Sequence, residues 1–402
     1  MQRSPTTGAE DRWIVLSAAV FAQTSTSMFQ FGIPFLIPEI REALGVSLEV
    51  AAILVACPSI GMIFTLIGWG HHADRLGDRW VMFTGLLGAA VMLAFTAAAG
   101  SALALGALLV LAGGFGASVN VTSGRVILKS FGEAQRGLAM GVRQTSPLLG
   151  MGFAALLLPR VAGARGFEDG LLLAAGICTL AAVVAFKVIG SARVTNTTSL
   201  VRSITPYRAP HLWRLHGAST LLVVPQIGVY SFVYLYLIEV EQLPTGPAGV
   251  AVAVALVAGA FMRLVAGVWS DRVKKRLEPM RALALVSTMV VALSATLVLV
   301  QSPVAALMLL VATAVSASWN GLAFTAVAEY AGHGWAGRAL GTQNTVQYIA
   351  TAAAPLGMAL VIANHGYALA FYAAAIVGLA GALLIPVQWR WHARPSRDAG
   401  DV

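Results

Sequence analysis

The sequence predicts an all-helical integral membrane protein with twelve membrane-spanning helices in two related halves of six. Three observations predict this fold class: the composition, the number of long apolar runs, and a repeated motif. Hydrophobic residues make up 58% of the 402 residues and charged residues only 11%, whereas a soluble domain carries about 25% charged residues. This composition excludes an ordinary water-soluble fold.

Apolar runs of spanning length follow one another along the whole chain. Helices are expected because backbone groups in hydrocarbon must be paired within the segment, and one span takes about 20 residues. The first half occupies residues 1–190, a polar linker residues 191–210, and the second half residues 211–402. The predicted spans are residues 13–37, 48–69, 80–99, 102–127, 138–160, 168–190, 212–238, 247–269, 281–301, 303–328, 338–363 and 366–388.

The basic residues predict the orientation of the chain. Of the 26 Lys and Arg residues, 20 fall at the end that carries both termini, three at the other end and three inside spans. Cytoplasmic loops are enriched in Lys and Arg, so we expect both termini in the cytoplasm of a multi-pass protein of a bacterial inner (plasma) membrane. The same rule accounts for the net charge of +9, and no nucleic-acid partner is needed.

Cysteine and histidine usage gives no sign of a metal or redox centre. Cys57 and Cys178 are the only cysteines, and both fall inside apolar runs, where cysteine behaves as a small apolar residue. The sequence also shows no spacing of a nucleophile and a base. We therefore expect neither a cofactor nor a metal site, and we do not expect an enzyme.

A short motif occurs twice at an offset of 197 residues, each time between the second and third predicted span of its half. This repeat indicates that the two halves share one architecture. The matching residues are Gly70 with Gly267, Asp74 with Asp271, and Arg75 with Arg272.

At these residues the sequence resembles the major facilitator superfamily. The family's loop signature is Gly, three residues, Asp, Arg or Lys, one residue, Gly, one residue, then basic residues. In the second copy Lys274 stands in place of the second Gly. The resemblance implies a secondary active or facilitative transporter that moves a small molecule by rocking its two halves, that functions as a monomer and that has no cofactor. The first copy matches the signature with Gly70, Asp74, Arg75, Gly77 and Arg79.

The resemblance also implies that both loops are conformational latches. In the family, the acidic residue of this loop meets the start of the eleventh helix when the cytoplasmic side is closed. Carried over, Asp74 would face residues 337–342. Asp271, in the second latch with Gly267 and Arg272, would face the counterpart segment near Gly137. The alternative is that these are solvated loop charges that only fix the orientation.

The family fold implies a central cavity between the halves, and several polar side chains lie on predicted spans that would line it. The alternative interpretation is hydrogen bonding between neighbouring helices, which is worth about 0.6 kcal/mol per contact. The candidate substrate contacts of this kind are Gln23, Gln30, Asn120, Tyr230 and Asn320.

Three arginines fall inside predicted spans, whereas every carboxylate lies in a loop, a tail or an end turn. An arginine at the centre of a span costs at least about 2.5 kcal/mol, and an anionic substrate would neutralise it. Arg143, its neighbour Gln144 and Arg263 are therefore candidates for anion binding. The alternative is that these arginines pair with carboxylates of the latch. This alternative is favoured for Arg125 and stays open for Arg143 and Arg263. Arg263 also fits a general pattern of the family, which weakens its claim to bind a specific substrate.

The predicted fifth helix refines the resemblance. Its segment from Gly141 to Gly152 is similar to the fifth helix of cyanate-transporter-like bacterial members. We therefore expect a small anionic or polar solute, such as a carboxylate or an inorganic anion. The alternative function is proton-driven efflux of hydrophobic drugs or metabolites, and the identity of any coupling ion is left open.

Overall fold

The computed structural model describes residues 9–190, 206–208, 210–332 and 335–387. Most of the predicted linker, residues 191–210, lies outside the described residues. The first half holds the helices α1 (Ala9–Gln30), η1 (Ile33–Leu36), α2 (Ile37–Leu44), α3 (Leu48–Leu76), α4 (Asp78–Phe95), η2 (Thr96–Ala98), α5 (Ala102–Ser130), α6 (Glu133–Arg165) and α7 (Phe167–Val188). The second half holds η3 (Pro206–Arg208), α8 (Pro210–Glu239), α9 (Thr245–Val273), α10 (Leu277–Leu299), α11 (Ala305–Val315), α12 (Asn320–Ala331) and α13 (Ala336–Leu384).

The membrane-spanning helices account for nearly all of the described chain. Among the described residues, ten helical segments are long and apolar enough to cross a membrane, and the bent pair formed by α1 and the η1–α2 segment makes eleven. The protein is therefore a multi-pass membrane protein, as the composition predicts. The count of twelve spans stays a prediction.

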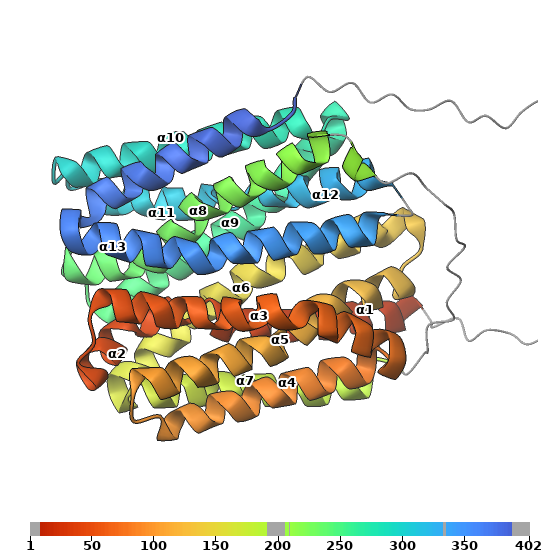
Figure 1. Cartoon of the computed structure of the whole chain (residues 1–402), viewed down its shortest axis with the longest axis horizontal. Helices are drawn as coiled ribbons and strands as arrows, with labels where there is room; N and C mark the ends of the chain where they lie inside the picture. Colours follow the sequence, from red (N-terminus) through yellow and green to blue (C-terminus); the bar gives the residue numbers. More distant parts are fainter. Residues whose placement is uncertain (1–8, 191–205, 209, 333–334, 388–402) are drawn as a thin grey trace, which may run out of the picture.

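The first predicted span and the last two differ in detail from the observed helices. The first span, predicted as one helix over residues 13–37, bends by 44° after Gln30, where Pro34 and Pro38 begin new helical segments because proline has no N–H to donate. The last two predicted spans lie in α13, which has 49 residues and is broken at Gly366 (φ 81°, ψ 174°). In Figure 1 the ribbon of α13 reverses direction at the left end of the molecule.

The two halves lie side by side, with the first half below and the second above in Figure 1, and their helices run along the long axis of the molecule. The halves meet where α6 packs on α9 and α3 packs on α13. At one end, Arg41 of the first half pairs with Glu239 of the second at 2.7 Å, and Tyr367 donates a hydrogen bond to Glu239 at 2.9 Å. We call this end the Arg41 end, and the end that carries the repeated loops the signature end.

Glycine allows the closest approach between α3 and α5 in the first half. A Cβ atom at Gly61 would lie 1.8 Å from the main-chain oxygen of Val110, so the two backbones are in contact there. Small residues allow such contacts between membrane helices. Gly68 of the same helix would carry a Cβ without any neighbour within 4 Å.

We expect Gly61→Ala to destabilise the protein by about 1–3 kcal/mol, because the added methyl group forces α3 and α5 apart. The measurement is the melting temperature of the full-length protein in detergent. Gly68→Ala is the matched control, since it makes the same chemical change in the same helix without a clash. Equal melting temperatures of the two variants would contradict the close packing described here.

Candidate functional site

Arg143 of α6 lies at the centre of a polar cluster inside the first half. Its Nε donates to Ser123 Oγ at 2.9 Å, and its Nη2 donates to Gln23 Oε1 at 3.4 Å and to the main-chain oxygen of Asn120 at 3.2 Å. Gln23 in turn donates to Asn120 Oδ1 at 3.2 Å and accepts from Ser123 Oγ at 3.2 Å. The cluster therefore joins α1, α5 and α6, and it brings together three of the predicted site residues.

Arg263 of α9 reaches the same region from the second half. Its Nη1 donates to the main-chain oxygen of Gln144 at 2.6 Å, and its Nε donates to the main-chain oxygen of Ala317 at 3.2 Å. The side-chain oxygen of Gln144 accepts from Arg143 Nη1 at 3.5 Å. Gln144 thus contacts both arginines, one through its side chain and the other through its backbone.

Among the described residues, both guanidinium groups have only neutral hydrogen-bond partners. Within the described part of the chain, neither Arg143 nor Arg263 forms an ion pair. A buried cation is ordinarily paired with an anion, because hydrogen bonds to neutral groups replace only part of its hydration. The site is therefore electrostatically suited to a negatively charged ligand.

A small cavity lies between the halves, on the side of the arginines that faces the Arg41 end. Two predicted site residues line it: Gln30 from α1 and Tyr230 from α8. The hydroxyl of Tyr230 is buried without a hydrogen-bond partner among the described residues, and the amide of Gln30 is buried with most of its hydrogen-bonding capacity unused. The other lining residues are Phe31, Pro34, Val55, Ser59, Met151, Ile227, Ser231, Thr351 and Pro355.

Tyr348 of α13 is a member of this site that the sequence does not reveal. Its hydroxyl lies beside the amides of Gln30 and Asn120 and close to the guanidinium of Arg143. A tyrosine of the second half therefore completes the polar cluster of the first half. Its position one turn before Thr351, which lines the cavity, is the only signal in the sequence.

Asn320, the last predicted contact, has a different environment. Its Oδ1 accepts a hydrogen bond from Gln347 Nε2 at 3.1 Å, which links α12 to α13. This contact is the interhelical bond that the alternative interpretation describes. The role of Asn320 as a substrate contact stays a prediction.

The signature end of the first half carries a separate ionic cluster. Arg125 pairs with Asp74 at 2.6 Å and with Asp78 at 3.1 Å, and Lys129 also pairs with Asp78. The Asp78 side chain is only 5% exposed, whereas that of Asp74 is 59% exposed. Arg125 therefore lies with the latch residues, apart from the other two intramembrane arginines.

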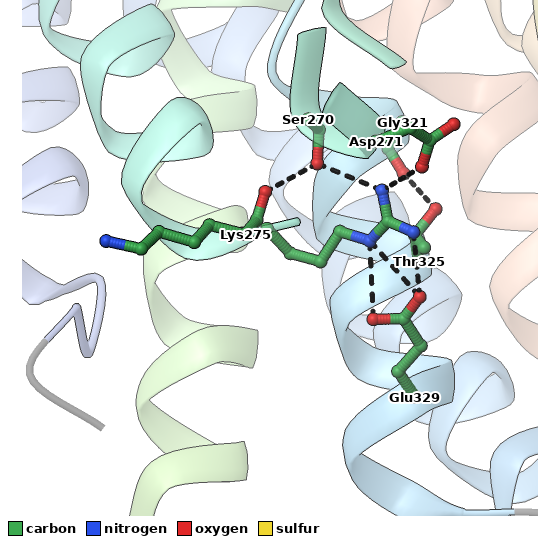
Figure 2. A network of polar contacts seen from close by, with 7 residues as sticks. Ser270, Asp271, Lys275, Gly321, Thr325 and Glu329 are labelled. Carbon is green, nitrogen blue, oxygen red and sulfur yellow. Dashed lines mark hydrogen bonds and ion pairs between the residues drawn. The ribbon is translucent and has the colours of Figure 1, made fainter. Parts of the chain in front are cut away.

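The second half has its own ionic cluster, built differently. Figure 2 shows a guanidinium held between the carboxylates of Asp271 and Glu329. It belongs to Arg276, which pairs with both carboxylates and donates to Ser270 Oγ at 3.0 Å. In the second half the cation comes from the end of the repeated loop. In the first half the corresponding cation is Arg125, which comes from α5.

The remaining latch residues have surface positions. Arg79 lies over the ring of Phe186, with its guanidinium carbon 3.9 Å from the ring centroid, whereas Arg75 and Arg272 are exposed. Gly77 has a φ of 85° between α3 and α4, a conformation that favours glycine. A Cβ at Gly70 or Gly267 would meet no atom within 4 Å.

In this structure two glycines at the start of α13 border open space at the signature end. Asp74 binds Arg125 of its own half, and a Cβ atom at Gly337 or Gly341 would meet nothing within 4 Å. Each ion pair that the described residues form at this end joins two groups of one half. The predicted contact of Asp74 with residues 337–342 belongs to a closed signature end and stays a prediction.

Comparison with known sequences gives one family and several relatives. The sequence profile described as Major Facilitator Superfamily matches residues 19–355. An uncharacterized MFS-type transporter of Mycobacterium tuberculosis is 35% identical over 391 residues, which cover 96% of this chain and 87% of that protein. A probable nitrate transporter, NarT of Staphylococcus carnosus, is 25% identical over 248 residues, which cover 59% of this chain and 61% of that protein.

Comparison with solved structures supports the fold. A bacterial homologue of the human lysosomal transporter Spinster, in an inward-facing and occupied conformation, superposes with a TM-score of 0.75. The match covers 96% of this chain and 97% of that structure at 14% sequence identity. At this identity the likeness shows the fold alone.

The burial of Asp78 yields a test of the first ionic cluster. We expect Asp78→Asn to destabilise the protein by about 2 kcal/mol, because Arg125 and Lys129 lose a buried anion while their own partial exposure lowers the cost. Asp74→Asn removes an exposed carboxylate of the same cluster and should cost less than about 1 kcal/mol. Melting temperatures of both full-length variants in detergent measure the difference, and a larger loss for Asp74→Asn would refute this ranking.

Proposed function

Since the chain belongs to the Major Facilitator Superfamily, it is a membrane transporter and not an enzyme, and we propose that its solute is a small anion. The observation that carries the proposal is the pair Arg143 and Arg263, two intramembrane guanidinium groups with only neutral partners. An intramembrane cation is costly, and a carboxylate or an oxyanion relieves this cost by accepting charge-assisted hydrogen bonds.

The family relationship supports the same solute class. The Staphylococcus carnosus relative is named as a probable nitrate transporter, and nitrate is a small planar anion. Arginine is suited to such ligands because its planar fork of donors can hold two oxygens of one anion. The segment that contains Arg143 and Gln144 also resembles cyanate-transporter-like members, whose name refers to another small anion.

We propose transport by alternating access between the two halves. At the Arg41 end the ion pair between Arg41 and Glu239 joins the two halves, whereas the described ion pairs at the signature end stay within each half. This asymmetry supports a conformation whose site opens toward the signature end. Twelve spans, cytoplasmic termini, a plasma-membrane location and function as a monomer belong to the same proposal.

The proposal predicts that anions stabilise the protein and that this effect depends on both arginines. A panel of nitrate, acetate and hexanoate is screened by thermal shift on the full-length protein in detergent. A ligand at a hundred times its Kd should stabilise by about 2.7 kcal/mol. Arg143→Gln and Arg263→Gln should abolish the shift, because each removes a charge that contacts the anion.

Arg160→Gln is the matched control for these variants. Arg160 is also an arginine of α6, but it is exposed and bonds to the main-chain oxygen of Leu156, so its removal should leave the shift intact. Saturable uptake of the stabilising anion into proteoliposomes then separates transport from binding. Absence of a shift with every anion, or an equal shift in Arg143→Gln, would sink the proposal.

The proposal also predicts weak pH dependence. The residues that hydrogen-bond to the two guanidinium groups in the structure contribute amides, a serine hydroxyl and main-chain carbonyls. A tyrosine lies near Arg143, and guanidinium stays protonated at pH values well above neutral. Hexanoate is fully ionised above about pH 6. Its Kd should therefore change less than about threefold between about pH 6 and about pH 8. A tenfold change would indicate a coupled proton and contradict this account.

A further inference from the structure

We infer that the preferred solute is an organic anion with an apolar segment and a second hydrogen-bonding group remote from its charge. This inference rests on the proposed function, because it takes the arginine pair as the site of the charged group. It goes further by assigning the cavity between Gln30 and Tyr230 to the uncharged part of the same solute. A bare inorganic anion would leave this second part of the site unused.

The unpaired atoms of the cavity are the first observation. The hydroxyl of Tyr230 is buried without a hydrogen-bond partner among the described residues. The buried amide of Gln30 lies beside the hydroxyl of Tyr348 and keeps donor and acceptor capacity that no described residue uses. Both Tyr230 and Gln30 line the cavity. A buried polar atom without a partner costs about 1–3 kcal/mol, so such atoms ordinarily bind water or a ligand. One donor-acceptor group comes from each half, which is the arrangement that holds a ligand between the halves.

The apolar walls of the cavity are the second observation. Six of its lining residues have apolar side chains, contributed by α3, α6, α8, α13, the 3₁₀ segment η1 and the turn before it: Phe31, Pro34, Val55, Met151, Ile227 and Pro355. Nitrate or another small oxyanion has no apolar surface to place against these walls. A carbon chain would bury its surface there, and each buried methylene contributes about 0.8 kcal/mol.

Residues of the cavity wall lie near the arginine pair. Tyr230, which lines the cavity, lies close enough to Arg263 for an electrostatic interaction, and Tyr348 lies near both Gln30 and Arg143. On α1, Gln23 contacts Arg143 and Gln30 lines the cavity. These two residues are two turns apart on one face of the helix, about 10 Å by helix rise. A ligand whose charged group binds the arginines can therefore place its other end at the cavity.

The test compares three probes on the full-length protein in detergent: nitrate, hexanoate and 6-hydroxyhexanoate. The two carboxylates differ by one hydroxyl, so the ratio of their Kd values reports the hydrogen bond at the far end of the site. We expect 6-hydroxyhexanoate to bind about tenfold tighter than hexanoate, and both to bind tighter than nitrate. Isothermal titration calorimetry gives the three Kd values.

Two substitutions assign the effect to the cavity. Gln30→Leu and Tyr230→Phe should each bring the ratio of the Kd values of hexanoate and 6-hydroxyhexanoate to within about twofold of one. Both variants should still bind hexanoate, which shows that they are folded. Tyr234→Phe is the matched control, since this hydroxyl belongs to the same helix, one turn on, and does not line the cavity. It should leave the ratio unchanged.

The outcomes separate this inference from the proposed function. If nitrate binds as tightly as 6-hydroxyhexanoate, or if Tyr230→Phe keeps the full ratio, the organic-anion inference is wrong while the anion transporter stands. If none of the three anions binds the wild type, the proposed function itself fails. A ratio that collapses in both cavity variants and persists in Tyr234→Phe establishes the inference.

Discussion

The structure depends on two positive charges that lie inside apolar helices and have no negative partner in the part of the chain that the structure describes. Arg143 and Arg263 are held by amides, a hydroxyl and main-chain oxygens from α1, α5, α6 and the α11–α12 region. These acceptors come from several helices, and three of them are main-chain oxygens. The helices must converge at this depth, and both halves must contribute. Placing these charges therefore also fixes where the halves meet.

The carboxylates are segregated from this region. Asp74, Asp78, Asp271 and Glu329 lie at the signature end and are neutralised there by Arg125, Lys129 and Arg276. The two clusters join different elements. The first takes its arginine from α5, and the second takes its arginine from the end of the repeated loop. Each half is thus tied internally at this end, so the halves can separate without exposing an unpaired charge to the hydrocarbon.

The sequence predicts the apolar framework well and the site in part. Long apolar runs must be helices in a membrane, which locates most spans, whereas the bend after Gln30 depends on how η1 and α2 pack. Gln23, Asn120, Arg143 and Gln144 were identified as polar residues on apolar helices, and the structure brings them together. Tyr348 was missed, because a tyrosine in a membrane helix is most often an interfacial or packing residue. Tyr348 joins the polar cluster because α13 packs against the first half, and this packing is visible only in the structure.

Gln144 links the binding of charge to the contact between the halves. Its side chain accepts from Arg143, and its backbone accepts from Arg263 of the opposite half. A guanidinium has a limited number of donors in a fixed plane, so an anion that binds Arg263 competes with the Gln144 carbonyl for them. The contact between the halves uses donors of Arg263 that the ligand would also use, so the stability of this contact changes when the ligand binds. This shared use of donors gives the two halves a physical means of responding to the solute.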